Sequence, residues 1–234
     1  SRRFQKMKLK LYHARWSLCS QMVRVAMAEK GLSYESKPIK LCDQYPEAEN
    51  LSLEYLAVNP KGIVPSLEID GEIVTESTNI IKRLNELSGE IDVDLWPDDV
   101  DQDLLNAWVA DTTLTDGVPL GKTLGTAIPP FSVILINFMV KKYLSFFQAI
   151  KVYWKHPLRD RGRFFLIMKF FNIQKPVAES CYKVLVNSLL DIEKHLKKSG
   201  PFFLGKFTHI DINLMCCFHP VSYTHLRAHE TRFY

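Results

Sequence analysis

Ser17 and Cys19 stand where a short alternating segment, residues 8–12, gives way to a helical pattern over residues 17–30. The first N–H groups of a helix have no partner within the helix and carry partial positive charge, so they stabilise an anion such as a thiolate. Ser17 could therefore donate a hydrogen bond to a bound thiolate. Cys19 could instead act as a nucleophile that forms a mixed disulfide with a ligand thiol. The structural alternative is that Ser17 caps the helix and Cys19 is a small buried residue.

A second candidate site is formed by Val64-Pro65, which begins a strand pattern, and Glu76-Ser77, which begins a helical pattern. Proline has no N–H to donate, so Pro65 leaves a backbone edge free at the start of the strand. An X-Pro bond is also the one peptide bond that is readily cis, and a cis bond would turn the Val64 backbone outward. A free backbone edge beside a helix N-terminus predicts a site for a peptide that carries a carboxylate.

The elements around these residues follow the order β-α-β-(α)-β-β-α over residues 8–88. Strands are predicted at residues 8–12, 34–39, 64–69 and 72–75, and helices at 17–30 and 77–87. The first two strands enclose a helix, so they should be parallel. Asp70-Gly71 between two alternating runs is a strong hairpin signal. The pattern predicts a small mixed α/β domain.

Strand signals end after residue 88. Residues 89–100 form a polar linker, and residues 101–220 carry helical patterns, at 101–111, 131–153, 162–172 and 176–198 and again from Asp211. Pro129-Pro130 and His156-Pro157 interrupt these patterns. We therefore expect an all-helical second domain over residues 101–220.

Composition narrows the class of protein. The net charge of the 234 residues is +4, which gives no reason to expect a nucleic-acid partner. The longest apolar run, about Phe131 to Val140, is too short to span a bilayer, and we interpret it as a buried or interface helix. Basic and aromatic residues alternate between Lys141 and Lys169. We interpret them as a solvated face, with a patch for nucleic acid or acidic lipid as the alternative.

The five cysteines are odd in number and lack the spacing of a disulfide framework or a metal site: Cys19, Cys42, Cys181, Cys216 and Cys217. That pattern favours free thiols in a reducing compartment. The basic N-terminus is not followed by the apolar stretch of a secretory signal. We therefore expect a cytoplasmic protein without a metal.

The segment from Tyr12-His13 to Gly31, with Ser17-Leu18-Cys19-Ser20 and Val23-Arg24, resembles the glutathione transferases. Residues 8–88 carry most of the likeness. It is nearest the zeta class, which includes maleylacetoacetate isomerase, and the glutathione-dependent reductive dehalogenases. It is also similar to the ganglioside-induced differentiation-associated protein, whose matching segment has no cysteine at position 19. The resemblance implies a thioredoxin-like domain with a four-stranded mixed sheet, joined to an all-helical domain.

The resemblance also implies a role for each candidate residue. Val64 would pair its backbone with the cysteine of glutathione ahead of a cis Pro65. Glu76-Ser77 would hold the γ-glutamyl group, where the zeta class has Gln-Ser. Ser17 would activate the glutathione thiolate, and Cys19 is the residue capable of redox chemistry.

The function expected from this likeness is a glutathione transferase whose co-substrate thiolate attacks a small electrophile, in conjugation or isomerisation. One alternative is Cys-dependent thiol transfer or reductive dehalogenation, and another is a non-enzymatic binding module. We expect a homodimer and no nucleic-acid partner. Membrane contact is not the favoured interpretation but stays open as an alternative. The electrophile would contact the helical half, near Trp108, Asp111 or Thr112.

Two segments near the C-terminus have their own interpretation. Gly205 to Asp211 matches the family's N-capping motif, in which Thr208 and Asp211 begin a core helix. Residues 221–231 match one reading frame of a transposon-end adaptor used to prepare DNA sequencing libraries. They show no helical or strand period. We therefore predict that the native sequence ends near His219-Pro220, that the helical domain is incomplete and that residues 221–234 are a non-native tail.

Overall fold

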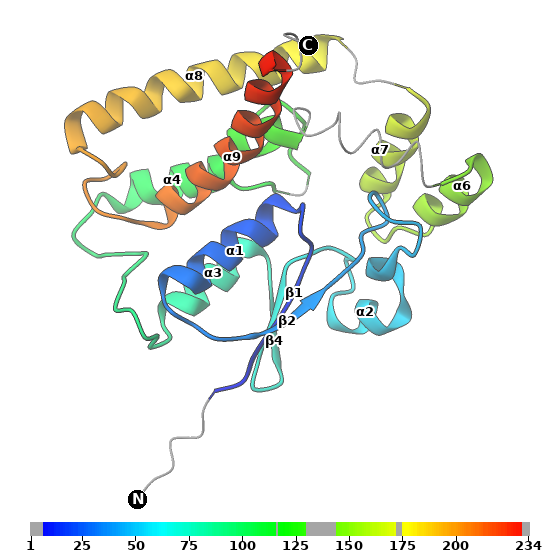
Figure 1. The fold of residues 1–234 in the computed structure, drawn as a ribbon, viewed down its shortest axis with the longest axis horizontal. Coiled ribbons are helices and arrows are strands. Elements are labelled where there is room, and N and C mark those ends of the chain that lie inside the picture. Colours follow the sequence, from blue (N-terminus) through cyan, green and yellow to red (C-terminus); the bar gives the residue numbers. More distant parts are fainter. Residues whose placement is uncertain (1–6, 116, 130–143, 172–174, 231–234) are drawn as a thin grey trace, which may run out of the picture.

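The computed structural model describes residues 7–115, 117–129, 144–171 and 175–230, apart from the side chains of residues 168 and 220–230. Its N-terminal part contains a four-stranded sheet in the order β2-β1-β3-β4 (Figure 1). The strands are β1 (Leu9–His13), β2 (Glu35–Pro38), β3 (Ser66–Ile69) and β4 (Glu72–Thr75). β1 is parallel to β2 and antiparallel to β3, which pairs antiparallel with β4. The predicted mixed sheet is confirmed.

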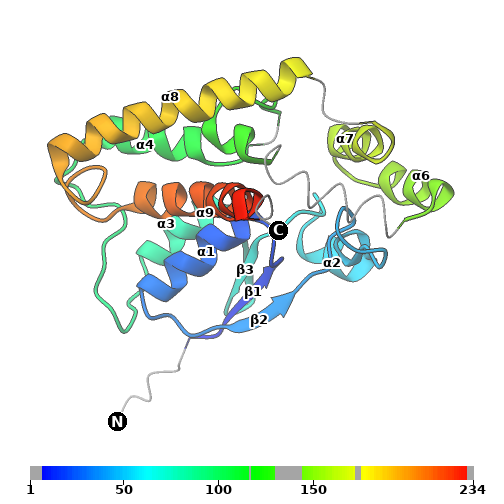
Figure 2. The same cartoon turned by 45° about the horizontal axis from the view of Figure 1, so that its top comes forward.

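Side chains alternate across the sheet and so divide its core in two. On one face, Leu11 of β1 and Leu67 of β3 are fully buried in the main hydrophobic core with α1 (Leu18–Glu29) and α3 (Ser77–Asn85). On the other face, the ring of Tyr12 lies 5.8 Å from that of Tyr55, which belongs to α2 (Leu53–Val58). The sheet is therefore covered by α1 and α3 on one side and by α2 on the other (Figure 2).

The Asp70-Gly71 hairpin is formed as the sequence predicts. Both residues have positive φ, at 50° and 95°, which is the backbone of a type I′ turn. Glycine adopts this conformation at no steric cost, and aspartate is among the residues that tolerate it. Ile69 and Glu72 consequently face each other as the pair that closes the loop.

The second half is helical in the described ranges. It contains α4 (Gln102–Thr112), a helical stretch at residues 124–129, α6 (Phe146–Trp154), α7 (Arg159–Phe170), α8 (Lys175–Ser199) and α9 (His209–Glu230). The helices predicted at 101–111, 162–172 and 176–198 correspond to α4, α7 and α8. Only the end of the prediction for 131–153 is described, as α6. Residues 131–143, including the predicted buried or interface helix, lie outside the described residues.

α9 connects the two halves. It packs between α1 and α4, and Ile210 and Ile212 are fully buried in the same core as Leu11 and Leu67. Both views show α9 lying along α1 (Figures 1 and 2). The sheet and the helical half therefore share one continuous hydrophobic core.

α6 and α7 form an antiparallel pair that docks elsewhere, on the loop between β2 and α2. Ala149 and Tyr153 of α6 are buried in a separate small core with Cys42 and Ala48 of that loop. The loop is itself fixed by Asn50, whose Oδ1 accepts a hydrogen bond from the Cys42 backbone N–H at 2.8 Å. Its Nδ2 donates to the Gly62 carbonyl, also at 2.8 Å. The helical pair is thus positioned by the sheet domain's loop.

The start of α9 confirms the predicted capping motif. Asp211 Oδ2 accepts from the backbone N–H of Thr208 at 2.8 Å, which is the reciprocal half of a capping box. Asp211 Oδ1 also accepts from the Phe203 backbone N–H at 2.9 Å. One carboxylate therefore accepts hydrogen bonds both from the start of the helix and from the turn that precedes it.

The far end of α9 differs from the sequence interpretation. The helix continues through Pro220 to Glu230, although residues 221–231 show no amphipathic period. A helix that has already nucleated extends by local backbone hydrogen bonds, which need no periodic apolar face. The non-native origin of this segment stays a prediction.

Replacing Asp211 by alanine should lower the free energy of unfolding by about 2 kcal/mol, because it removes the cap and leaves the Phe203 N–H without its acceptor. Urea denaturation of the full chain measures this change. The matched control is Asp101→Ala at the start of α4, where Oδ1 accepts one hydrogen bond, from Leu104 N–H at 2.9 Å. That variant should lose about 1 kcal/mol. Equal losses in the two variants would show that Asp211 acts as an ordinary cap.

Candidate functional site

The start of α1 has the structure that the capping interpretation of Ser17 predicts. Ser17 is the N-cap residue, with extended backbone, and its Oγ accepts from the Ser20 backbone N–H at 3.2 Å. Ser20 in turn holds the preceding turn, because its Oγ accepts from the Ala14 backbone N–H at 3.2 Å. The Ser17 hydroxyl uses an acceptor position in this bond, so it keeps its proton to donate.

A small cavity lies beside the first turn of α1. Its volume is about 20 Å³, which is room for about one water molecule. It is lined by Cys19, Ile63, Val64, Pro65, Glu76, Ser77, Leu114 and Arg161. Five of the six site residues predicted from sequence therefore meet in one place. Ser17 is the exception and is not in the cavity lining.

The Val64-Pro65 bond is cis, as the sequence predicts, and it precedes the first paired residue of β3. The turn before it is held by two side chains that share the Ile63 carbonyl. Tyr55 Oη donates to that oxygen at 2.7 Å and Asn59 Nδ2 donates to it at 2.9 Å. Both also contact Ser66 Oγ, at 3.1 Å each. These buried hydrogen bonds fix the backbone at Val64 relative to β3.

Glu76 has an unusual backbone, with φ 68° and ψ 122°. Positive φ is uncommon for residues other than glycine, and such strained residues cluster at functional sites. Glu76 is the N-cap of α3 but makes no capping hydrogen bond with its side chain. Its carboxylate instead lies 2.6 Å from Lys61 Nζ, while Ser77, the first residue of the helix, is buried at the cavity wall.

The cavity sets the charge state of Cys19. Burial raises the pKa of the Cys19 thiol above its ordinary value. A hydrogen bond with Ser77, the positive charge of Arg161 and a backbone hydrogen bond at Leu114 act in the opposite direction, and the negative charge of Glu76 adds to the increase. The net result is a thiol that is mostly protonated at neutral pH.

Arg161 comes from α7, so the helical half supplies one cation to the cavity. Its charge acts on Cys19 and also on the buried carboxyl of Asp43, in the loop on which α6 and α7 dock. Burial raises the pKa of Asp43 to about 6, and Arg161 partly offsets that increase. The sequence alone predicts Arg161 on a solvated basic face, because nothing in its neighbourhood along the chain indicates a cavity.

The residues predicted to meet the electrophile lie mainly in the helical core. Trp108 packs on Phe203, with ring centroids 4.6 Å apart. Thr112 is fully buried, and its Oγ accepts from Asn213 Nδ2 at 2.9 Å. The helical half contributes Leu114 and Arg161 to the cavity in their place.

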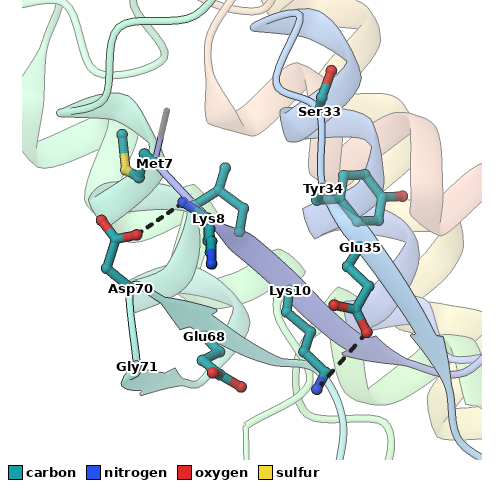
Figure 3. A pocket seen from close by; sticks show the side chains of 10 residues that line it. Met7, Lys8, Lys10, Ser33, Tyr34, Glu35, Glu68, Asp70 and Gly71 are labelled. Carbon is teal, nitrogen blue, oxygen red and sulfur yellow. Dashed lines mark hydrogen bonds and ion pairs between the residues drawn. The ribbon is translucent and has the colours of Figure 1, made fainter. Parts of the chain in front are cut away.

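A broader open hollow exists at the other end of the strands. It is lined by Met7 to Lys10, Ser33 to Glu35, Glu68, Asp70 and Gly71 (Figure 3). Its charges are largely matched across the hollow. Lys10 Nζ lies 3.8 Å from Glu35 Oε1, and Asp70 Oδ1 accepts from the Lys8 backbone N–H at 2.9 Å. The lining of this hollow includes neither a cysteine nor a helix N-terminus.

Two further surveys apply to the described ranges. No three His, Cys, Asp or Glu side chains gather there as metal ligands would. No described helix combines the length and apolar character needed to cross a bilayer.

Comparison with known proteins shows what the sheet domain is similar to. Residues 16–87 match the family model described as "Glutathione S-transferase, N-terminal domain". Maleylacetoacetate isomerase of Pseudomonas aeruginosa is 43% identical over 79 residues, which cover 33% of this chain and 36% of that protein. Tetrachloro-p-hydroquinone reductive dehalogenase of Sphingobium chlorophenolicum is 37% identical over 71 residues, which cover 30% of this chain and 27% of that protein. The chain thus spans about a third of the length of these curated relatives.

The likeness of fold extends further than the likeness of sequence. The crystal structure of the β-etherase LigF from Sphingobium sp. strain SYK-6 matches with a TM-score of 0.77 at 19% identity, covering 92% of this chain and 84% of that one. The described chain therefore has the fold of the glutathione transferases, and residues 16–87 match the model of their N-terminal domain.

Proposed function

We propose that this protein is a glutathione-dependent enzyme that uses the glutathione thiolate to attack a small electrophile, in conjugation or isomerisation. The observation that carries the proposal is the convergence of three elements on one cavity. These elements are the first turn of α1, the cis Val64-Pro65 bond and the Glu76-Ser77 start of α3. Each supplies a different group that a γ-glutamyl peptide requires.

The peptide would be held by its backbone and by its charged end. Val64 precedes the β3 ladder, and its backbone would pair with the cysteinyl unit as an added strand would. The N-terminus of α3 favours the α-carboxylate of the γ-glutamyl group, and the Glu76 carboxylate favours its ammonium. A tripeptide is far larger than the present cavity, so residues that line the cavity must rearrange when the tripeptide binds.

The chemical step would depend on ionising the bound thiol. A free thiol with a pKa of about 8.5 is only a few per cent thiolate at neutral pH, so a modest decrease multiplies the nucleophile. The Ser17 hydroxyl, with its proton available to donate, and the N–H groups of the first turn of α1 would supply that decrease.

A second candidate function is favoured by the position of Cys19. It lines the cavity, whereas Ser17 does not. In this alternative the Cys19 thiolate attacks the glutathione sulfur of a disulfide between glutathione and another thiol, forming a Cys19–glutathione disulfide and releasing the other thiol as its thiolate. A free glutathione thiolate then attacks the glutathione sulfur bound to Cys19, which forms glutathione disulfide and releases the Cys19 thiolate. Reductive dehalogenation would use the same cysteine.

The wider assignments rest on family resemblance. We propose residues 8–88 as the glutathione-binding domain, 89–100 as the linker and the rest of the native chain as the helical domain. A homodimer in the cytoplasm is part of the same proposal.

Replacing Ser17 and Cys19 by alanine, one at a time, distinguishes the two candidate reactions. If conjugation or isomerisation is the reaction, Ser17→Ala should lower kcat at least tenfold and Cys19→Ala should change it little, because the thiolate belongs to glutathione. The measurement is turnover with an electrophile panel and with a glutathione mixed disulfide. Loss in Cys19→Ala alone assigns the Cys-dependent reaction. Retention on glutathione resin without turnover of any substrate would overturn both enzymatic proposals.

The Glu76 backbone offers a test of the binding mode. Glu76→Gly should leave the protein as stable as the wild type or up to about 1 kcal/mol more stable, since glycine adopts positive φ freely. It should weaken glutathione binding about tenfold, because a charge-assisted contact is lost. Calorimetric titration and thermal unfolding measure the two effects.

The matched control for this test is Asp70→Gly. Asp70 also has positive φ, 50°, but lies in the hairpin at the other end of the sheet. It should leave glutathione affinity unchanged. If the two variants bind glutathione equally well, the γ-glutamyl group is not held at Glu76.

Cys19 should react slowly with iodoacetamide at neutral pH, because burial raises its pKa and lowers the thiolate fraction. The rate should increase with pH and go on increasing above pH 9, because the pKa of Cys19 lies above 9, the ordinary value for the group. Glu76→Gln removes a charge that raises this pKa, so at a fixed pH it should speed the reaction. Peptide mass spectrometry of Cys19 follows the rate, and Glu86→Gln, at the exposed end of α3, is the control. A pH-independent rate would contradict the assigned charge state.

A further inference from the structure

The α6–α7 pair exposes an unusual amount of aromatic surface. Phe147 is 81% exposed, Trp154 69% and Phe171 67%. Four more large apolar side chains of the same segment are at least a third exposed. We call the seven residues together the aromatic patch: Phe146, Phe147, Ile150, Trp154, Ile167, Phe170 and Phe171. Contiguous exposed apolar surface of this kind marks an interaction site.

The aromatic patch crosses from one helix to the other. The Phe146 ring lies 5.3 Å from that of Phe147 and 5.0 Å from that of Phe170, measured between centroids. The opposite side of α6 is already occupied, since Ala149 and Tyr153 are buried on the β2–α2 loop. Both views place α6 at the outer edge of the molecule (Figures 1 and 2). The patch therefore faces away from the body of the protein as described.

The same surface is strongly basic. Four exposed cations belong to the same segment of the chain as the aromatic residues: Lys151, Lys155, Arg159 and Arg163. Between residues 144 and 171 the sequence has a single acid, Asp160, which lies 3.5 Å from Arg163. Arg159 lies over the Trp154 ring, 5.7 Å from its centroid, and donates to the Trp154 carbonyl at 3.1 Å. Aromatic rings and guanidinium groups are thus presented together.

The positive charge around the aromatic patch indicates which kind of partner could bind there. A second copy of the chain, paired through this patch, would bring two basic surfaces together, which is unfavourable. An acidic surface is favoured instead. Exposed phenylalanine and tryptophan flanked by lysine and arginine are the composition of an interfacial helix, whose apolar side chains enter the acyl boundary while its cations contact anionic headgroups.

We propose that the α6–α7 pair docks on the surface of a membrane containing anionic lipid, with the aromatic patch inserted and the four cations at the headgroups. The contact is peripheral, since no helix in the described ranges is long and apolar enough to span. The proposal goes beyond the glutathione site and does not depend on its activity.

Flotation of the full chain with vesicles tests the proposal. We expect binding to phosphatidylcholine vesicles that contain phosphatidylserine, weak binding to pure phosphatidylcholine, and loss of binding at high salt. Phe147→Ala should weaken binding about tenfold or more, and Lys155→Ala about fivefold. The matched controls are Leu53→Ala on α2, 89% exposed, and Lys183→Ala on α8, also exposed, which should bind as the wild type does.

Three results would overturn the proposal. The first is that the vesicle experiment fails to single out the patch: the wild type binds neither vesicle type, or Phe147→Ala and Leu53→Ala bind the phosphatidylserine vesicles equally. The second is a lower melting temperature for Phe147→Ala with unchanged vesicle binding, which would mean that the ring packs within the protein. The third is a wild-type dimer in sedimentation that Phe147→Ala converts to a monomer, which would assign the patch to self-association.

Discussion

The pairing of β1 with β3 is the constraint on which the candidate site depends. Because the two strands are antiparallel, the chain leaves β1 at the same end of the sheet at which it enters β3. Cys19 and the Val64-Pro65 bond are therefore neighbours although 45 positions separate Cys19 from Val64 in the sequence. The β3–β4 hairpin returns the chain to that end once more, so α3 begins there with Glu76 and Ser77. The cavity therefore forms at one end of the sheet, where the chain leaves β1, enters β3 and leaves β4.

The helical half is held to this sheet by α9. Asp211 fixes its start, and Asn213 on the next turn donates to Thr112 and Thr113 at the end of α4, at 2.9 and 3.3 Å. Thr113 Oγ in turn lies 3.4 Å from Thr78 Oγ of α3. Since these hydrogen bonds fix the end of α4 against α3, Leu114 is placed at the cavity wall. Packing of α9 thus determines which helical residue faces the candidate ligand.

Much of the fold can be predicted from the chain because its signals are local. Asp70-Gly71 determines a hairpin through backbone geometry, Val64-Pro65 indicates a cis bond, and Thr208 with Asp211 indicates a helix start. The period of apolar residues predicts α1, α3, α4, α7 and α8, since it reflects burial on one face. The continuation of α9 beyond Pro220 was not predicted, because that stretch has no such period.

The sequence by itself determined the elements of the sheet domain and five residues of the cavity, because each lies in a motif whose geometry is fixed within a few positions. Only the tertiary structure decided that Arg161 completes the cavity, that Trp108 packs on Phe203 and Thr112 is buried, and that basic and aromatic residues of α6 and α7 are exposed together. These depend on how helices distant in sequence dock. Docking depends on the summed burial of many side chains from different parts of the chain, so no short segment of the sequence predicts it.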